Sequence, residues 1–340
     1  MCMNGLVLLH AVKLVAAFAT FSLILYLSPY PAGATTPIKI AIAYDLGGRG
    51  DHGINDSAAK GVDTVKKKFK LTFLSVREMV TNGLESDRES RLQFLASAHY
   101  NLVIAVGADY AQAVKIVALA NPSTQFALIN DASIGDLNIS DMVFSNPDGA
   151  YLAGVLAGAA TKRNKIGFVA PNNLAINFIY FKRGIASVNP KAIALGQSME
   201  GTPASATQAL VSQGVDVIFS LWSSTSEVQD SVAARSTAKR PLYFIGVSPD
   251  QYFLQEKNTQ KILLGAVSKH IDIAVADVMV AALRQETVID TLDAARGFYG
   301  HMYTVKDGGV SMALTNLGAK YSVKIATAIA ALKSGKVKLS

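Results

Sequence analysis

The sequence IKIAIAYDLGGRGDHGIND (residues 38–56) is the stretch that decides the fold. Its first seven residues are mostly apolar, which is typical of a strand buried on both faces of a parallel sheet. A glycine-rich turn follows, and from Asp56 to Phe69 apolar residues recur at the spacing of a helix. The stretch therefore predicts the first strand, turn and helix of an α/β fold.

The same alternation of short apolar runs and helical patterns continues along the chain in two series. The first series predicts strands at residues 38–44, 71–76, 102–106, 125–129 and 142–144, and the second at 165–169, 192–195, 215–220, 242–245 and 262–266. The chain has 340 residues, half of them apolar, which is enough for two cores. We therefore predict two Rossmann-like lobes with parallel sheets, joined by a multi-segment hinge. The predicted boundaries are 35–146 plus 269–304 for lobe 1, and 147–268 plus 305–340 for lobe 2.

The N-terminal segment has the pattern of an export signal. Lys13 precedes an apolar run from Leu14 to Leu27, and Ala32-Gly33-Ala34 offers the small-x-small pattern that signal peptidases cleave. We expect residues 1–34 to be a signal peptide and the protein to be extracytoplasmic, in the cell envelope, at the cell surface or in the periplasm. An uncleaved membrane anchor is the alternative. The only cysteine, Cys2, would leave with the signal, so no disulfide is expected.

The charge balance is mildly basic, with 32 Lys and Arg against 25 Asp and Glu and a formal charge of +7. In an exported protein, such an excess is typical of a solvated surface or of attraction to an anionic cell envelope. The basic run from Lys66 to Lys68 is not interleaved with the aromatic side chains that a nucleic-acid surface uses. No nucleic-acid partner is therefore expected.

The turn after the first predicted strand contains Gly48, Gly50 and Gly53, which match the G-x-G-x-x-G pattern of dinucleotide-binding folds. Asp45 and Asp51 would place negative charge beside a pyrophosphate, which makes that interpretation weak. In open α/β sheets, ligands bind beyond the carboxyl ends of the strands. Asp45 is therefore a candidate ligand contact, able to accept hydrogen bonds from a sugar hydroxyl or an amine.

Further candidate side chains follow later strands. Asp109 is either a helix N-cap or a ligand contact. Trp222, the only tryptophan, lies in a run of Ser and Thr residues and is either a core residue or a ring that stacks on a planar ligand. Ser248 and Asp250 follow the strand predicted at 242–245. Lys269 lies where the chain should recross between lobes. It is either a surface charge, a contact to a ligand hydroxyl, or a residue that locks a closed state through a carboxylate.

Known enzyme signatures are absent from the sequence. It contains no G-x-S-x-G, H-E-x-x-H or Walker A pattern, and its five histidines are too scattered for an obvious metal site. No catalytic residue, metal or cofactor is therefore expected. An α/β enzyme whose site is assembled only in the folded chain is an alternative.

The order of short motifs from about Ile38 to Leu332 resembles the basic membrane protein family of substrate-binding proteins, which includes purine-nucleoside-binding components of ABC importers. The resemblance implies a periplasmic-binding-protein type I fold, with Asp45, Asn55 and Lys269 in contact with the ligand. The motifs are DLGG (45–48), GIN (53–55), VG (106–107), FALI (126–129), DGAYLAG (148–154), KIGFV (165–169), VNP (188–190), GV (246–247) and KDGGV (306–310).

Two positions depart from the nucleoside-binding members of that family. Ile54 stands where those members have an aromatic residue that stacks on the base, and Ser248 stands where they have an Asp. Trp222 is a candidate for a replacement stacking ring. The resemblance implies the solute-binding component of an ABC importer, with a nucleoside as the first ligand hypothesis and a sugar or other hydroxylated solute as the second.

The expected partners are a membrane permease and a separate ATPase subunit, and the chain is expected to be a monomer. A surface sensor or antigen without transport is the remaining alternative among binding proteins.

Overall fold

A computed structural model describes residues 37–72, 75–198, 202–221, 227–247, 257–286, 292–293 and 297–339. The chain divides into two units, Met1–Pro37 and Ile38–Ser340, and all the helices and strands described below belong to the second. The predicted signal peptide at 1–34 lies outside the described residues.

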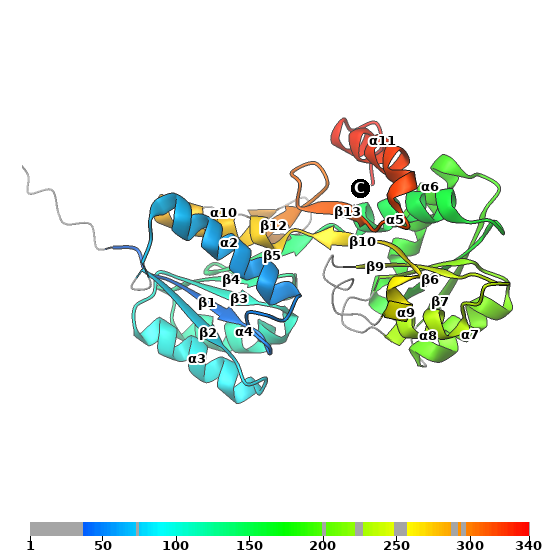
Figure 1. The fold of residues 1–340 in the computed structure, drawn as a ribbon. Helices are drawn as coiled ribbons and strands as arrows, with labels where there is room; N and C mark the ends of the chain where they lie inside the picture. Colours follow the sequence, from blue (N-terminus) through cyan, green and yellow to red (C-terminus); the bar gives the residue numbers. More distant parts are fainter. Residues whose placement is uncertain are drawn as a thin grey trace, which may run out of the picture. The chain divides into compact units, whose positions relative to one another are not determined.

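The described residues of the second unit form two α/β lobes, each built on its own sheet (Figure 1). The sheet of lobe 1 has the strand order β11-β12-β5-β4-β3-β1-β2, and only β11 runs antiparallel to its neighbour. This sheet confirms the prediction of a largely parallel lobe. Its strands are β1 (Ile40–Tyr44), β2 (Val76–Val80), β3 (Leu102–Val106), β4 (Gln125–Ile129), β5 (Ile139–Phe144), β11 (Leu292–Asp293) and β12 (Phe298–Tyr303).

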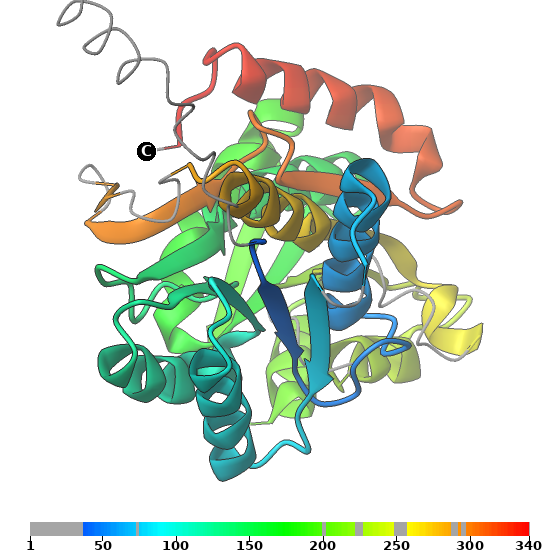
Figure 2. The ribbon, with the colours of Figure 1, turned by 90° about the vertical axis from the view of Figure 1, so that its left-hand side faces the viewer.

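Helices cover both faces of the lobe 1 sheet (Figure 2). On one face, α2 (Ile54–Phe69) packs against α10 (Ile271–Leu283), and on the other α3 (Glu85–Ser97) packs against α4 (Ala111–Ala120). Side chains alternate along β1 accordingly: Ile40, Ile42 and Tyr44 join one hydrophobic core, and Ala41 and Ala43 join the other. All five are buried, which explains the unbroken apolar run in the sequence.

The sheet of lobe 2 has the order β13-β10-β9-β8-β6-β7, in which only β13 is antiparallel to its neighbour. Helix α5 packs against α6 on one side of this sheet, and α7 packs against α8 on the other. The lobe contains strands β6 (Lys165–Ala170), β7 (Ile193–Ser198), β8 (Val217–Ser220), β9 (Tyr243–Val247), β10 (Leu263–Lys269) and β13 (Val310–Leu314). Its helices are α5 (Asn146–Ala160), α6 (Phe178–Val188), α7 (Pro203–Ser212), α8 (Glu227–Arg235), α9 (Lys257–Gln260) and α11 (Ser322–Lys333), with 3₁₀ turns at Asn172–Asn177 and Ala319–Tyr321.

Two glycines set the distance between α5 and α6. A Cβ atom at Gly154 would overlap the carbonyl oxygen of Phe181, and a Cβ at Gly184 would overlap that of Tyr151. The two backbones therefore lie in direct contact, and no larger residue fits at either position.

The chain passes between the two sheets after β5, after β10 and after β12. The three connections are hydrogen-bonded to one another: Ser145 N donates to Tyr303 O at 2.8 Å, and His270 N donates to Gly309 O at 2.9 Å. The connections therefore form one bonded group, which is the multi-segment hinge of the fold.

One predicted strand is wrong. Residues 71–76 were expected to form the second strand, but β2 begins at Val76 and its register pairs Val76 with Ile40. β2 lies at the edge of the sheet, so only Val76 is fully buried along it, and its sequence VREMV lacks the continuous apolar run of a central strand. The predicted range shares only Val76 with β2, whereas each of the other nine predicted strands overlaps an observed strand by at least three residues.

Candidate functional site

The carboxyl ends of β1 and β3 bring two of the predicted site residues to one cation. Asp45 follows β1, and Asp109 lies in the 3₁₀ turn (Ala108–Tyr110) that follows β3. Arg88 of α3 donates from Nη2 and Nε to Asp45 Oδ1, at 2.8 and 3.3 Å. The same Nη2 lies 3.4 Å from Asp109 Oδ2. Neighbouring strands of a parallel sheet end at the same edge, which is why these two carboxylates meet.

Arg88 is the central residue of this cluster, and it is not among the site residues predicted from the sequence. It is only 7% exposed, and burial opposes its charge, but the hydrogen bond to Asp45 and the surrounding carboxylates outweigh burial and raise the pKa of Arg88. The signal was present in the sequence, because Arg88 is in helical register with the buried residues Leu92 and Leu95. A cation on the apolar stripe of an amphipathic helix needs a carboxylate partner.

Asp45 keeps one oxygen available. Both hydrogen bonds from Arg88 reach Oδ1, while Oδ2 accepts none from the described residues. The backbone of Gly107 lies beside Oδ2, and a Cβ atom at this position, where φ is +103°, would be 3.6 Å from it. The Asp45 side chain is 19% exposed. The result is a carboxylate that is fixed and charge-balanced on one side and open on the other.

Asn55 organises the turn after β1. It is 1% exposed, and its Oδ1 accepts from Asp45 N at 3.0 Å while its Nδ2 donates to Asp51 Oδ2 at 2.9 Å. The same Nδ2 lies 3.3 Å from the carbonyl oxygens of Asp45 and Leu46. Its amide is therefore fully engaged in holding the backbone on which Asp45 is presented.

The turn after β1 does not have the free backbone donors that a dinucleotide-binding site needs. The Asp51 carboxylate accepts from the backbone N–H groups of Gly53, Asn55 and Asp56 at 2.7 to 3.1 Å. These are the donors at the N-terminus of α2 that would otherwise bind a phosphate. With a carboxylate already in that position, this turn does not fit a pyrophosphate.

Ile54 and Lys269 lie apart from the Arg88 cluster. Ile54 is half-buried and packs against the hydrophobic core at the start of α2. Lys269, at the end of β10, donates from Nζ to Asn130 Oδ1 at 2.9 Å, and Asn130 directly follows β4. Burial lowers the pKa of Lys269 to about 8. The structure thus joins Lys269 to the same edge of the lobe 1 sheet at which Asp45 lies, without a direct contact to Asp45.

Trp222, Ser248 and Asp250 lie outside the described residues. Within the described ranges, no group of three or more His, Cys, Asp and Glu side chains could hold a metal ion. The helices in those ranges are also too short or too polar to cross a membrane.

A family model described as "ABC transporter substrate-binding protein PnrA-like" matches residues 38–324. A CD4+ T-cell-stimulating antigen of Listeria innocua is 29% identical over 261 residues, which cover 70% of this chain and 71% of that protein. An ABC transporter nucleoside-binding protein, BmpA of Lactococcus lactis, is 23% identical over 89% of each chain.

Among solved structures, an ABC transporter solute-binding protein of Aeropyrum pernix superposes with a TM-score of 0.62 at 18% identity, over 89% of this chain and 93% of that one. This similarity is in the fold, which is that of the type I periplasmic solute-binding proteins. The family match spans both lobes, and so the chain belongs to the PnrA-like family of ABC transporter substrate-binding proteins.

Proposed function

We propose that this chain captures a small, uncharged, hydroxylated ligand, a nucleoside first and a sugar second, and delivers it to a membrane permease that a separate ATPase drives. The observation that carries the ligand class is the state of Asp45. Its charge is balanced by Arg88 and its Oδ2 is open, so it suits a neutral hydroxyl donor better than a cation. The Lactococcus relative, whose name states nucleoside binding, supports the nucleoside as first choice.

Asp45 is proposed to receive ligand hydroxyl groups, with Arg88 holding it in place and Asn55 fixing its backbone. Lys269 is proposed to donate to the ligand from the end of β10. Trp222, Ser248 and Asp250 are proposed to complete the site from lobe 2, with Trp222 stacking on a planar base. The ligand is bound and released unchanged, because capture requires only hydrogen bonds and stacking.

A thermal-shift panel of nucleosides, free bases, sugars and amino acids tests the proposal. A ligand that binds the native state stabilises it by mass action and so raises the melting temperature. At a ligand concentration of 100 times Kd, the added stability is about 2.7 kcal/mol. Inosine, adenosine or guanosine should give the largest shift, and isothermal titration should give one site per chain. No shift with any member of the panel would count against capture, and turnover of a panel compound would favour an enzyme.

Asp45→Asn is the most direct test, because it keeps the shape of the side chain and removes the negative charge that pairs with Arg88. A hydrogen bond to a charged group contributes about 1.5–3 kcal/mol, so the affinity should fall about 10- to 100-fold. The matched control is Asp63→Asn, which removes an exposed carboxylate of α2 that pairs with Arg49 and should leave affinity unchanged.

Ligand-dependent quenching of the fluorescence of the only tryptophan would report that the ligand stacks on Trp222. An unchanged spectrum at saturation would remove Trp222 from the site.

A further inference from the structure

The charge of the chain is divided unequally between the segments of the two lobes. Residues 145–269 and 305–340, which carry the lobe 2 sheet, contain 18 Lys and Arg against 8 Asp and Glu, a formal charge of +10. Residues 35–144 and 270–304, which carry the lobe 1 sheet, contain 13 against 17, a formal charge of −4. The mild net charge of the whole chain therefore conceals a strongly basic lobe.

Five exposed cations lie close together in lobe 2, and we call them the basic face: Lys182, Arg183, Lys306, Lys336 and Lys338. The first two lie on α6, the third in the connection between β12 and β13, and the last two in the segment after α11. Arg183 Nη2 donates to the carbonyl oxygen of Lys338 at 2.8 Å, which fixes α6 to the C-terminal segment.

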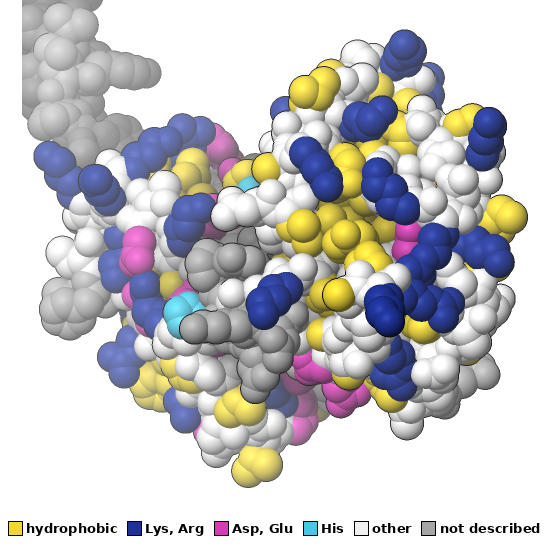
Figure 3. Space-filling model, turned by 45° about the vertical axis from the view of Figure 1, so that its right-hand side comes forward, with side chains coloured by type: hydrophobic (Ala, Val, Ile, Leu, Met, Phe, Trp, Pro, Cys, Tyr) yellow, Lys and Arg dark blue, Asp and Glu magenta, His cyan; other side chains and the backbone are white. Residues whose placement is uncertain are grey.

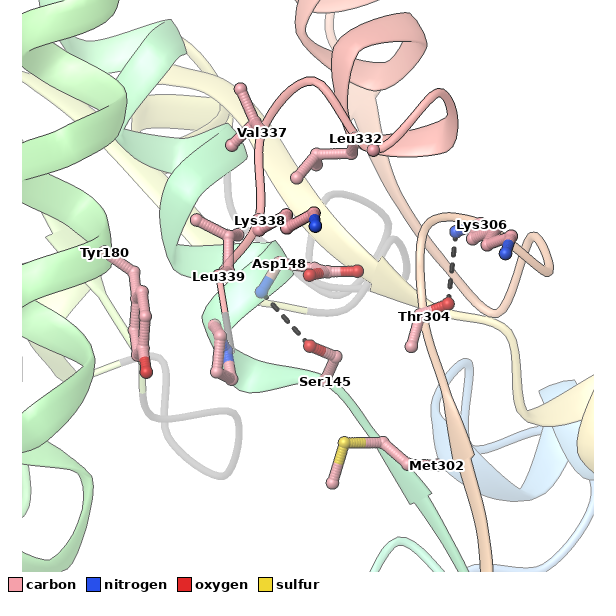
Figure 4. Close-up of a pocket in the computed structure, with 12 residues that line it drawn as sticks. Ser145, Asp148, Tyr180, Met302, Thr304, Lys306, Leu332, Val337, Lys338 and Leu339 are labelled. Carbon is pink, nitrogen blue, oxygen red and sulfur yellow. Dashed lines mark hydrogen bonds between the residues drawn. The ribbon is translucent and has the colours of Figure 1, made fainter. Parts of the chain in front are cut away.

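A hollow with an apolar floor lies within the basic face. Lys306 and Lys338 line a cavity of about 530 Å³ together with apolar side chains (Figure 4). Figure 3 shows Lys and Arg side chains around an apolar hollow on the molecular surface. The apolar lining consists of Pro147, Tyr180, Met302, Leu332, Val337 and Leu339.

Two carboxylates near the basic face are hydrogen-bonded to backbone N–H groups. Asp148, which also lines the cavity, accepts from Val305 N at 2.7 Å. Asp307 accepts from Thr304 N at 2.8 Å and Gly309 N at 3.0 Å. Both are engaged with the backbone of the β12–β13 connection. None of the five cations forms an ion pair within the described ranges, whereas in lobe 1 Arg49, Lys60, Lys66, Arg88 and Arg91 are all paired.

Exposed apolar side chains lie beside these cations. Ile176 is 63% exposed and Ile179 is 42% exposed. Ile179 precedes Lys182 and Arg183 by three and four residues, so all three lie on one face of α6. A surface that mixes unpaired lysines with exposed isoleucines is typical of proteins that bind at the lipid–water interface.

We propose that the basic face docks on an anionic phospholipid bilayer. Four of its five cations are lysines, whose flexible, point-like charges suit a fluid array of phosphates and do not impose the fixed geometry of a protein partner. The isoleucines enter the interfacial layer beside them. The basic face contains none of the residues around Arg88, so docking leaves the proposed ligand site free and holds the protein near its permease.

Vesicle cosedimentation of the full-length chain tests the proposal. The vesicles contain phosphatidylcholine alone or with 30% phosphatidylglycerol, at 50 and 300 mM NaCl. The test variant is Lys306→Gln/Lys336→Gln/Lys338→Gln. The control is Lys67→Gln/Lys68→Gln/Lys115→Gln, which removes three exposed lysines of lobe 1 and changes the net charge equally. Any binding by other segments is common to both variants and cancels in their comparison.

The test variant should bind the anionic vesicles on the order of 100-fold more weakly at 50 mM NaCl, and the control within about threefold of the wild type. The difference should shrink at 300 mM NaCl because salt screens the charges. Equal losses in both variants, or equal binding to both kinds of vesicle, would overturn the proposal. Circular dichroism confirms that each variant is folded.

A second variant separates a bilayer from a soluble polyanion. Ile176→Ser/Ile179→Ser should weaken binding to anionic vesicles several-fold and leave retention on a heparin column unchanged. If this variant binds vesicles like the wild type while the lysine variant loses heparin retention, the face serves a polyanion and the bilayer proposal is wrong.

Discussion

Lys269 gives the sharpest stability prediction, because its only described hydrogen bond is to the neutral amide of Asn130. Burial lowers its pKa from 10.5 to about 8. The folded chain therefore holds this proton less tightly than the unfolded chain does. Between pH 8 and 10.5 the unfolded state binds more protons, so stability must rise with pH across this window.

The magnitude follows from the two pKa values. One pKa unit corresponds to about 1.36 kcal/mol, so the charged Lys269 costs about 3 kcal/mol at pH 7 relative to an unshifted lysine. At pH 10 most of this cost has disappeared, because the folded state is then neutral at this position. The contribution of Lys269 to the free energy of unfolding should therefore become more favourable by about 2.5 kcal/mol from pH 7 to pH 10.

Urea unfolding of the wild type and Lys269→Met, followed by circular dichroism at each pH unit from 7 to 10, measures this change. All other titrating groups are common to both proteins, so the difference between the two curves isolates Lys269. From pH 7 to pH 10, the free energy of unfolding of the wild type should rise by about 2.5 kcal/mol relative to that of Lys269→Met. A Lys269→Met curve that stays parallel to the wild-type curve would refute the assignment of a desolvated lysine.

Two further predictions concern the cores. Gly154→Ala or Gly184→Ala should lower the free energy of unfolding in urea by about 2–3 kcal/mol, because each added Cβ overlaps a carbonyl oxygen of the partner helix. Gly196→Ala is the control: its Cβ would lie 3.5 Å from the nearest atom, in the Phe178 ring, so the free energy of unfolding should change by less than about 1 kcal/mol. Equal effects at all three positions would contradict the packing. Burial raises the pKa of Asp141 to about 6, so as the pH rises the unfolded state loses this proton before the folded state does. Between pH 4 and pH 7, the free energy of unfolding of the wild type should therefore fall by about 2 kcal/mol relative to that of Asp141→Asn. A stability difference that does not change with pH would contradict a desolvated carboxyl group.

The central strands could be predicted from the sequence to within a few residues, because a strand buried on both faces is an unbroken apolar run with a clear start and end. β3 and β4 match their predicted bounds. Edge strands lack this signal, which is why β2 was misplaced by several residues. β12 joins its sheet by pairing with β5, and β13 joins its sheet by pairing with β10, and both partner strands lie far away in the sequence. No local pattern shows which sheet accepts either strand.

The candidate site was predictable only in part, for a similar reason. Asp45 and Asp109 could be found because both directly follow strands that the sequence marks well. Arg88 comes from a helix and reaches them across 43 and 21 residues of chain, a contact that strand-end reasoning does not include. Ligand contact by Asn55 stays a prediction. The structure adds that its amide holds the turn, a role that depends on the path of the backbone between residues 45 and 55.

The three connections between the sheets also determine the order in which the chain can fold. The lobe 1 sheet includes β12, and its helical layer includes α10, so the first lobe stays incomplete until about residue 303 has been made. The lobe 2 sheet is likewise incomplete until β13 has been synthesised. Neither lobe is an independent folding unit, and a chain truncated before Ile271 would expose the apolar faces of both. Folding must therefore proceed late and through contacts of high sequence separation, which makes it slow.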